Sequence, residues 1–225
     1  MNEPVPAPAD DHDLRAVSPM ELAGRLAAKL CHDFISPTSA LVSGLDLLDD
    51  PSSADMREEA MALIASSGRK LEALLTFYRV AFGGSQATEL FDARDLEKLA
   101  RGRFEHARAE LDWAVEPDAL NKAPARALTN LVELACTVLP LGGVARLEAR
   151  EADGRIGLTL RAEHPRARLH DDTHRGLAGE PLGEGLGGRW VQPYYLQALV
   201  AEAGGRLDFR AEEGLVAVRV DLPSG

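Results

Sequence analysis

A long amphipathic helix pattern near the start of the chain constrains the fold most, because its apolar stripe needs a partner surface. The pattern begins at Ser18-Pro19-Met20-Glu21, where serine suits the N-cap, proline the first helical position and glutamate the capping box. At about 100° per residue, its large apolar side chains share one stripe. They are Leu22, Leu26, Leu30, Phe34, Leu41, Leu45 and Leu48.

A second helix pattern follows after a short break at 49–53, and Ser53 or Asp55 is expected to cap it. Its apolar positions recur in steps of three and four up to Phe82, and Gly83-Gly84 ends it. Two long helices joined by a short turn form a hairpin, which has too little surface to cover both stripes by itself. We therefore predict a homodimer through residues 18–83, in which two hairpins form a four-helix bundle.

The remainder of the chain mixes helix and strand patterns. Helices are predicted over 92–108, 123–139 and 191–203, strands over 111–115, 144–151, 155–162, 206–211 and 215–222, and a loop over 164–189. The expected fold class is α + α/β, a helical hairpin followed by an α/β sandwich with helices on one face of a mixed sheet. The predicted units are a flexible tail at 1–17, the hairpin at 18–84 and the α/β domain at 85–225.

Charge and cysteine usage exclude several classes of function. The net charge of −11 argues against nucleic acid as the main partner. Cys31 and Cys136 are far apart and form no CxxC pair, so neither a zinc site nor a disulfide framework is expected. No apolar run approaches the roughly 20 residues of a membrane span, and the acidic N-terminus is unlike a signal peptide. We expect a cytoplasmic protein without a membrane partner.

His32 lies nearly opposite the apolar stripe of the first helix, among small and polar side chains. Position alone favours an ordinary solvated histidine. Pro37, five residues later, removes a backbone donor inside the helix and is expected to kink or loosen the turn after His32. A proline is costly in a purely structural helix, which indicates that this part of the helix has another role.

The segment His32-Asp33-Phe34-Ile35-Ser36-Pro37 resembles the phosphoacceptor box of two-component histidine kinases, a histidine followed by an acid and, five residues on, a proline. Residues 18–83 resemble the dimerisation and phosphotransfer hairpin of that family. Residues 90–223 resemble its Bergerat-type ATP-binding domain in layout. The resemblance implies that His32 accepts a phosphoryl group.

The nucleotide motifs of that family are degenerate here. Leu134 stands where kinases have a magnesium-binding asparagine, and the segment around Glu163 lacks the glycines of the adenine-binding motif. Residues Gly183 to Gly188 resemble a second glycine-rich box, but a turn leading into the helix near Trp190 is the favoured interpretation. We therefore expect no nucleotide site and no metal site.

A kinase-type hairpin joined to a degenerate ATP domain resembles the ChpT-type histidine phosphotransferases of bacterial phosphorelays. The implied reaction moves a phosphoryl group from the receiver domain of a hybrid histidine kinase to His32, and then to the receiver domains of response regulators. The protein needs no cofactor of its own, since Mg²⁺ comes with the receiver. Asp33 is expected to assist His32, and an alternative role for it is an intrahelical partner of Lys29.

The receiver is expected to contact the outer face of the first helix, with Ile35 at the edge of the patch. The other contacts are Arg25, Ala28, Lys29, Ser36 and Ser39. The second half is expected to add contacts that select among receivers. Two alternatives remain open: an ATP-dependent histidine kinase with divergent nucleotide boxes, and a non-catalytic scaffold that only binds receivers.

Overall fold

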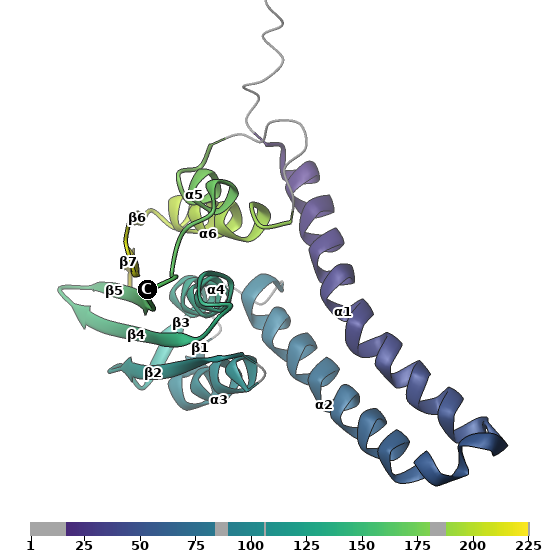
Figure 1. The fold of residues 1–225 in the computed structure, drawn as a ribbon. Coiled ribbons are helices and arrows are strands. Elements are labelled where there is room, and N and C mark those ends of the chain that lie inside the picture. The colour runs from purple at the N-terminus through teal and green to yellow at the C-terminus, as the bar shows by residue number, and fades with distance from the viewer. Residues whose placement is uncertain (1–16, 84–89, 106, 181–187, 225) are drawn as a thin grey trace, which may run out of the picture.

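A computed structural model describes residues 17–83, 90–105, 107–180 and 188–224. A long helical hairpin leans against an α/β domain (Figure 1). The tail predicted at 1–17 lies outside the described residues except for Val17. The predicted order, a hairpin followed by a domain with a mixed sheet, is confirmed.

The hairpin consists of α1 (Pro19–Asp49) and α2 (Arg57–Phe82), joined by the 3₁₀ turn η2 (Pro51–Met56). Ser18 caps α1 as predicted, since its hydroxyl accepts a hydrogen bond from the backbone N–H of Glu21 at 3.2 Å. The helix α1 continues through Pro37, which is buried. The two helices approach closely at Gly44, where an added Cβ would lie 2.7 Å from Cγ1 of Ile64.

One local expectation for the hairpin, the cap of its second helix, is wrong. Neither Ser53 nor Asp55 caps α2; Met56 precedes it and makes no side-chain capping bond. Asp50 caps η2 instead, accepting from the backbone N–H of Ser52 at 2.9 Å, so the break is capped at its first turn. Leu45, on the apolar stripe of α1, is 52% exposed in the single chain, in line with the expectation that one hairpin leaves part of its stripes uncovered.

The α/β domain contains a five-stranded sheet in the order β2-β4-β5-β7-β6. The strands are β2 (Ala109–Val115), β4 (Gly143–Ala152), β5 (Arg155–Glu163), β6 (Arg206–Glu212) and β7 (Leu215–Pro223). β2 runs parallel to β4, and the other pairs are antiparallel. A two-residue turn joins β4 to β5, and both of its residues, Asp153 and Gly154, have positive φ, as the twist of a tight hairpin requires.

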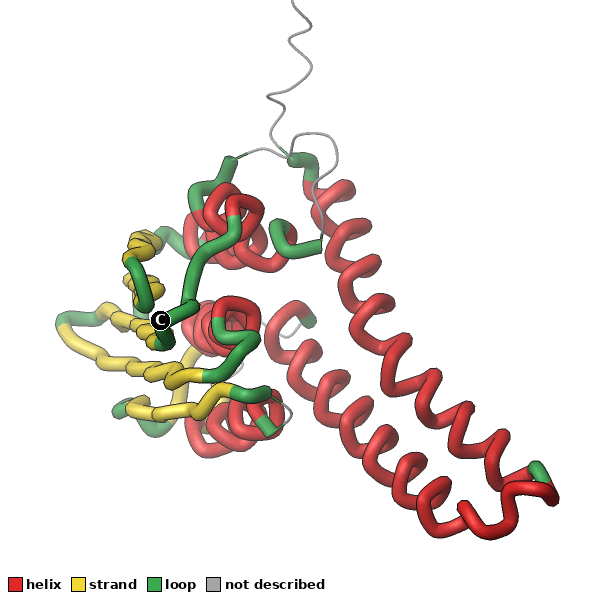
Figure 2. The backbone as a smooth tube through the Cα atoms, in the orientation of Figure 1, coloured by secondary structure: helices red, strands yellow, loops and turns green. Residues whose placement is uncertain are grey.

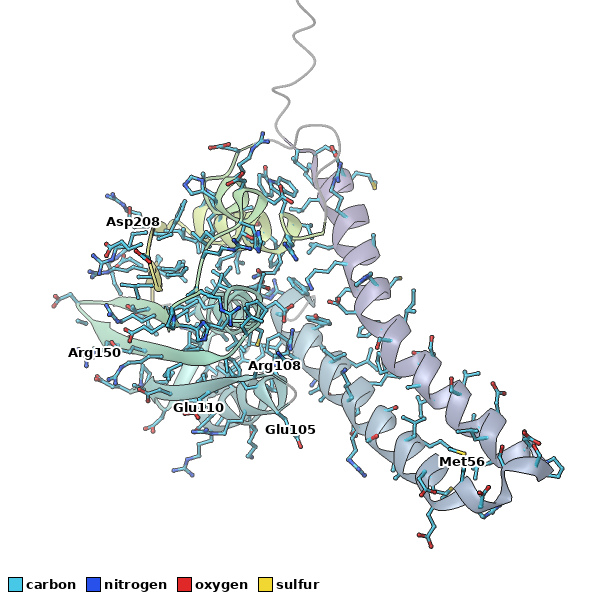
Figure 3. The ribbon with its side chains drawn as sticks, viewed as in Figure 1. Met56, Glu105, Arg108, Glu110, Arg150 and Asp208 are labelled. Atoms are coloured by element: carbon cyan, nitrogen blue, oxygen red, sulfur yellow. The ribbon has the colours of Figure 1, made fainter. Side chains whose placement is uncertain are left out.

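Helices cover one face of this sheet, as Figure 1 shows. They are α3 (Ala93–Phe104), α4 (Lys122–Val138), α5 (Asp171–Leu177) and α6 (Val191–Glu202). Alternate residues of β5, from Ile156 to Ala162, are buried beneath the helices. On the side of the molecule away from the hairpin, the charged side chains of Arg150 and Asp208 extend outward (Figure 3).

Three features of this domain differ from the sequence prediction. The helix expected over 92–108 ends at Phe104, and the loop expected over 164–189 contains α5. A short ladder of β1 (Leu90–Asp92) and β3 (Ala119–Asn121) was not predicted. Elements of three to seven residues carry too little periodicity to be recognised without their packing partners.

The hairpin and the α/β domain share one core. Phe77, Tyr78 and Ala81 near the end of α2 are buried in the same apolar cluster as the interior residues of α4 and β5. The opposite end of the hairpin stands clear of the α/β domain (Figure 2), with Met56 at its tip (Figure 3). The middle of α1, which carries His32, is therefore held beside the α/β domain by the packed end of α2.

Candidate functional site

His32 projects from the middle of α1 into solvent, and its side chain is 87% exposed. Its Nδ1 lies 3.3 Å from Oδ1 of Asp33, the next residue. A carboxylate at this place accepts a hydrogen bond from an Nδ1–H group, and the lone pair of the imidazole is then on Nε2. The geometry thus favours a histidine with its outer nitrogen available as a nucleophile.

Two donors hold the carboxylate of Asp33 on the side away from His32. Its Oδ2 accepts hydrogen bonds from Nζ of Lys29 and from the hydroxyl of Tyr78, both at 2.6 Å. Burial by itself would raise the pKa of Asp33, but these hydrogen bonds and the charge of Lys29 lower it below its ordinary value. Asp33 is therefore an anion with a defined orientation. The intrahelical pairing with Lys29 is confirmed, and it coexists with the contact to His32.

Glu133 on α4 continues this arrangement into the α/β domain. Its Oε1 accepts from Nζ of Lys29 at 3.1 Å, and its Oε2 accepts from Nε of Arg103 on α3 at 2.8 Å. The side chain of Glu133 is only 4% exposed and that of Lys29 14%. We call Lys29, Asp33, Tyr78, Arg103 and Glu133 the buried charge cluster. Its two carboxylates and two cations balance, and this is how charges are tolerated away from water.

The pKa values in the buried charge cluster follow from this pairing. Burial would raise the pKa of Glu133, but Arg103 and Lys29 lower it below its ordinary value. Burial would lower the pKa of Lys29, but Glu133 and Asp33 raise it. Burial and the two carboxylates strongly raise the pKa of Tyr78, so its hydroxyl keeps its proton. All four charges are thus present at neutral pH.

Sequence analysis missed Tyr78, Arg103 and Glu133 as members of this site. They come from α2, α3 and α4, and no spacing in the chain connects them. One signal was available: Glu133 interrupts a run of apolar residues at the centre of a buried helix. A charge in such a place normally has a charged partner.

A groove of about 660 Å³ lies beside His32, between α1 and the α/β domain. Ala28 and His32 line it on the side of α1, and Thr137, Pro140 and Arg189 line it on the opposite side. Arg189 is exposed and has no hydrogen-bond or ion-pair partner among the described residues. A partner that reaches His32 therefore meets both halves of the molecule.

The predicted receiver contacts lie along the outer side of α1. Ala28, Ile35, Ser36 and Ser39 are exposed. Arg25 is partly exposed and pairs with Glu21 at 2.8 Å. The expected outward position of Lys29 is wrong, because its ammonium group is directed into the buried charge cluster and its side chain is only 14% exposed. Contact of the other five residues with a receiver remains a prediction.

The positions of the degenerate nucleotide motifs are also defined. Leu134 is fully buried in the core of the α/β domain. Glu163 ends β5 and pairs with Arg161 at 2.8 Å. Most of the glycine-rich segment, residues 183–187, lies outside the described residues. Over the described part of the chain, no three His, Cys, Asp or Glu side chains are grouped to hold a metal ion.

Residues 93–214 match the family model of the histidine phosphotransferase C-terminal domain. The protein phosphotransferase ChpT of Brucella abortus (strain 2308) is 34% identical over 200 residues, which cover 87% of this chain and 92% of that protein. This chain belongs to the histidine phosphotransferase family. The predicted family and the predicted class of activity, a histidine phosphotransferase of a phosphorelay, are confirmed.

The chain was also compared with solved structures. A bacterial phosphotransferase structure is similar to this histidine phosphotransferase with a TM-score of 0.80 and 27% identity, covering 92% of this chain and 99% of that chain. The histidine kinase AdeS of Acinetobacter baumannii gives a TM-score of 0.47 at 14% identity, covering 86% of this chain and 98% of that chain. Among the helices of the described residues, none is long and apolar enough to cross a membrane.

Proposed function

We propose that His32 is the phosphoryl acceptor of this histidine phosphotransferase and that receiver aspartates are its donors and acceptors. The observation that carries this proposal is the combination of an exposed imidazole with a fixed carboxylate on its Nδ1 side. An acceptor in a protein relay has to be reachable by a second protein, and its reacting nitrogen has to be unprotonated. His32 is exposed, and a carboxylate stands on its Nδ1 side to accept a hydrogen bond from that nitrogen, which leaves Nε2 toward the solvent as the proposed nucleophile.

The reaction follows from this geometry. The Nε2 lone pair of His32 attacks the phosphorus of a receiver aspartyl phosphate, and the bond between phosphorus and the aspartate oxygen breaks. The electron pair of that bond leaves with the receiver carboxylate. Asp33 balances the positive charge that develops on the imidazole and keeps the proton on Nδ1. The reverse sequence passes the phosphoryl group to another receiver, and positioning supplies most of the catalysis.

The partners that we propose are the receiver domain of a hybrid histidine kinase and those of response regulators. Mg²⁺ would come with the acidic pocket of the receiver, because carboxylates are the ligands that this ion prefers. The receiver would contact Ala28, Ser36 and Ser39 on α1. The groove beside His32 would let Arg189 of the α/β domain add contacts that select among receivers.

A second copy of the chain is the proposed occupant of an apolar stripe on the hairpin. Val42 and Leu45 are exposed and lie three residues apart, so they share one side of α1. Met61 and Leu75 are likewise exposed on α2 and lie fourteen residues apart. Two hairpins joined along these residues would form a four-helix bundle. The free thiols of Cys31 and Cys136 are consistent with the cytoplasmic location that we propose.

The deciding experiment supplies a phosphorylated cognate receiver and measures acid-labile label on this protein. Wild type should become labelled and His32→Ala should not. No transfer to wild type would support the scaffold alternative, and undiminished labelling of His32→Ala would show that His32 is not the acceptor. In a parallel incubation with labelled ATP and Mg²⁺, substantial self-labelling of His32 would support the kinase alternative.

A further inference from the structure

Glu133 is connected to His32 by a continuous series of short contacts, although it belongs to a different domain. Its Oε1 lies 3.1 Å from Nζ of Lys29, and that Nζ lies 2.6 Å from Oδ2 of Asp33. The other oxygen of Asp33 lies 3.3 Å from Nδ1 of His32. The series contains only one exposed member, the imidazole itself.

We propose that Glu133 is a positioning residue, which anchors Lys29 and thereby holds Asp33 in the orientation that fixes the tautomer and the ring of His32. This inference rests on the proposed role of His32 as acceptor. It assigns a catalytic contribution to the α/β domain that requires no nucleotide. Glu133 itself touches neither the phosphoryl group nor the imidazole.

The charge balance explains why Asp33 depends on Glu133. Lys29 and Arg103 are both largely buried and share Glu133 as a partner. Without this carboxylate, Asp33 would be the one anion left to two buried cations, which would draw it inward and away from His32. With Glu133 present, its two oxygens bind one cation each, Arg103 through Oε2 and Lys29 through Oε1, and Lys29 lies between two carboxylates.

Tyr78 limits the number of positions that Asp33 can take. The hydroxyl has one proton to donate, and its oxygen lies 2.6 Å from Asp33 but 3.4 Å from Glu133. It therefore donates to Asp33. Oδ2 of Asp33 is thus bound by two donors and Oδ1 is left for the imidazole. Without Glu133, Nζ of Lys29 could move away from Oδ2 of Asp33, and Asp33 would lose one of these two donors.

The test uses Glu133→Gln in the full-length protein, because glutamine keeps the volume and removes the charge. Transfer from a phosphorylated receiver to His32 should slow by about tenfold, the effect of a small misplacement of a reacting group. Imidazole ¹⁵N shifts should show a smaller fraction of the Nδ1–H tautomer of His32. Lys29→Met should slow transfer similarly, and the double variant should be no slower than Lys29→Met alone, because Glu133 acts through Lys29.

Asn130→Ala is the matched control. Asn130 lies one turn before Glu133 on α4, is fully buried and donates to the backbone carbonyl of Ala81 on α2 at 3.1 Å. Its loss should weaken the packing of α4 against the hairpin at α2 without touching Lys29 or Asp33. The rate per folded molecule and the tautomer of His32 should therefore stay at wild-type values.

The proposal is overturned if Glu133→Gln retains the wild-type rate and tautomer, or if Asn130→Ala matches it in both. Additive effects of Lys29→Met and Glu133→Gln would also contradict it. If wild type accepts no phosphoryl group from the receiver, the proposed function fails instead. The tautomer of His32 in the unphosphorylated protein then still tests the role of Glu133.

Discussion

Lys29 on α1 and Glu133 on α4 form an ion pair with 3.1 Å between Nζ and Oε1, and this pair joins the hairpin to the α/β domain. Both side chains are largely removed from water, so the pair has few alternative partners. Because Lys29 also binds Asp33, changes in the α/β domain can reach the surroundings of His32. The stability of the two halves should likewise depend on this contact.

Glu133→Ala should lower the free energy of unfolding by about 3–5 kcal/mol, because it leaves Lys29 and Arg103 largely buried without their common carboxylate. Urea denaturation followed by circular dichroism measures the change. Glu97→Ala, which removes an exposed intrahelical partner of Arg101, serves as the control and should change stability by less than about 1 kcal/mol. Equal losses in the two variants would contradict the importance assigned to Glu133.

Acid should weaken the fold through Asp33 and Glu133. Despite burial, neighbouring cations hold the pKa of each carboxyl below its ordinary value. A group whose folded-state pKa is lowered contributes stability that is fully present above its unfolded pKa of about 4. This contribution is lost as the pH falls through the folded-state pKa. Free energies of unfolding from pH 6 down to pH 3 should therefore fall more steeply for wild type than for Glu133→Gln; parallel curves would count against this coupling.

Gly44 should not tolerate a larger residue, although it lies inside a helix. An added Cβ would meet Cγ1 of Ile64 at 2.7 Å and the carbonyl of Ala60 at 3.2 Å. Gly44→Val should destabilise the hairpin by about 1–3 kcal/mol through overpacking. Gly24 on the same helix has nothing within 4 Å, so Gly24→Ala should stabilise by about 0.5–1 kcal/mol. Thermal unfolding of the two variants should shift in opposite directions.

The oligomeric state tests the apolar stripe on the hairpin. Val42→Lys combined with Leu45→Lys should convert a dimer to a monomer, because it places two charges at a surface that a second copy is proposed to bury. Ser43→Lys is the matched control, since Ser43 is exposed on a different side of α1. Sedimentation equilibrium gives the mass of each variant. A monomeric wild type, or a dimer that survives both lysines, would reject this arrangement.

The spacing of apolar residues was sufficient to predict the longer helices and strands. The two helices of the hairpin and the N-cap at Ser18 are local patterns, and each was predicted close to its observed place. α5 was missed because its seven residues are defined by contact with α6, where Gly176 lies against the backbone of Trp190. The sequence of α5 alone does not indicate this contact with α6.

The candidate site likewise contains some residues whose association the sequence predicts and others whose association it does not predict. His32, Asp33 and Lys29 lie within one turn of a helix, so their association could be predicted from the sequence. Tyr78, Arg103 and Glu133 meet them only because three further helices converge there, and that convergence is a property of the tertiary fold. The pairing of Lys29 with Glu133 joins positions 104 residues apart.

The core that the end of α2 shares with the α/β domain limits how far the position of His32 can change relative to Glu133. Moving His32 relative to Glu133 would require Phe77 and Tyr78 to leave buried positions. Donor and acceptor receivers would therefore meet the same arrangement of side chains around His32. Any two receivers served by this protein have to share the side chains that fit it, however much the rest of their surfaces has diverged.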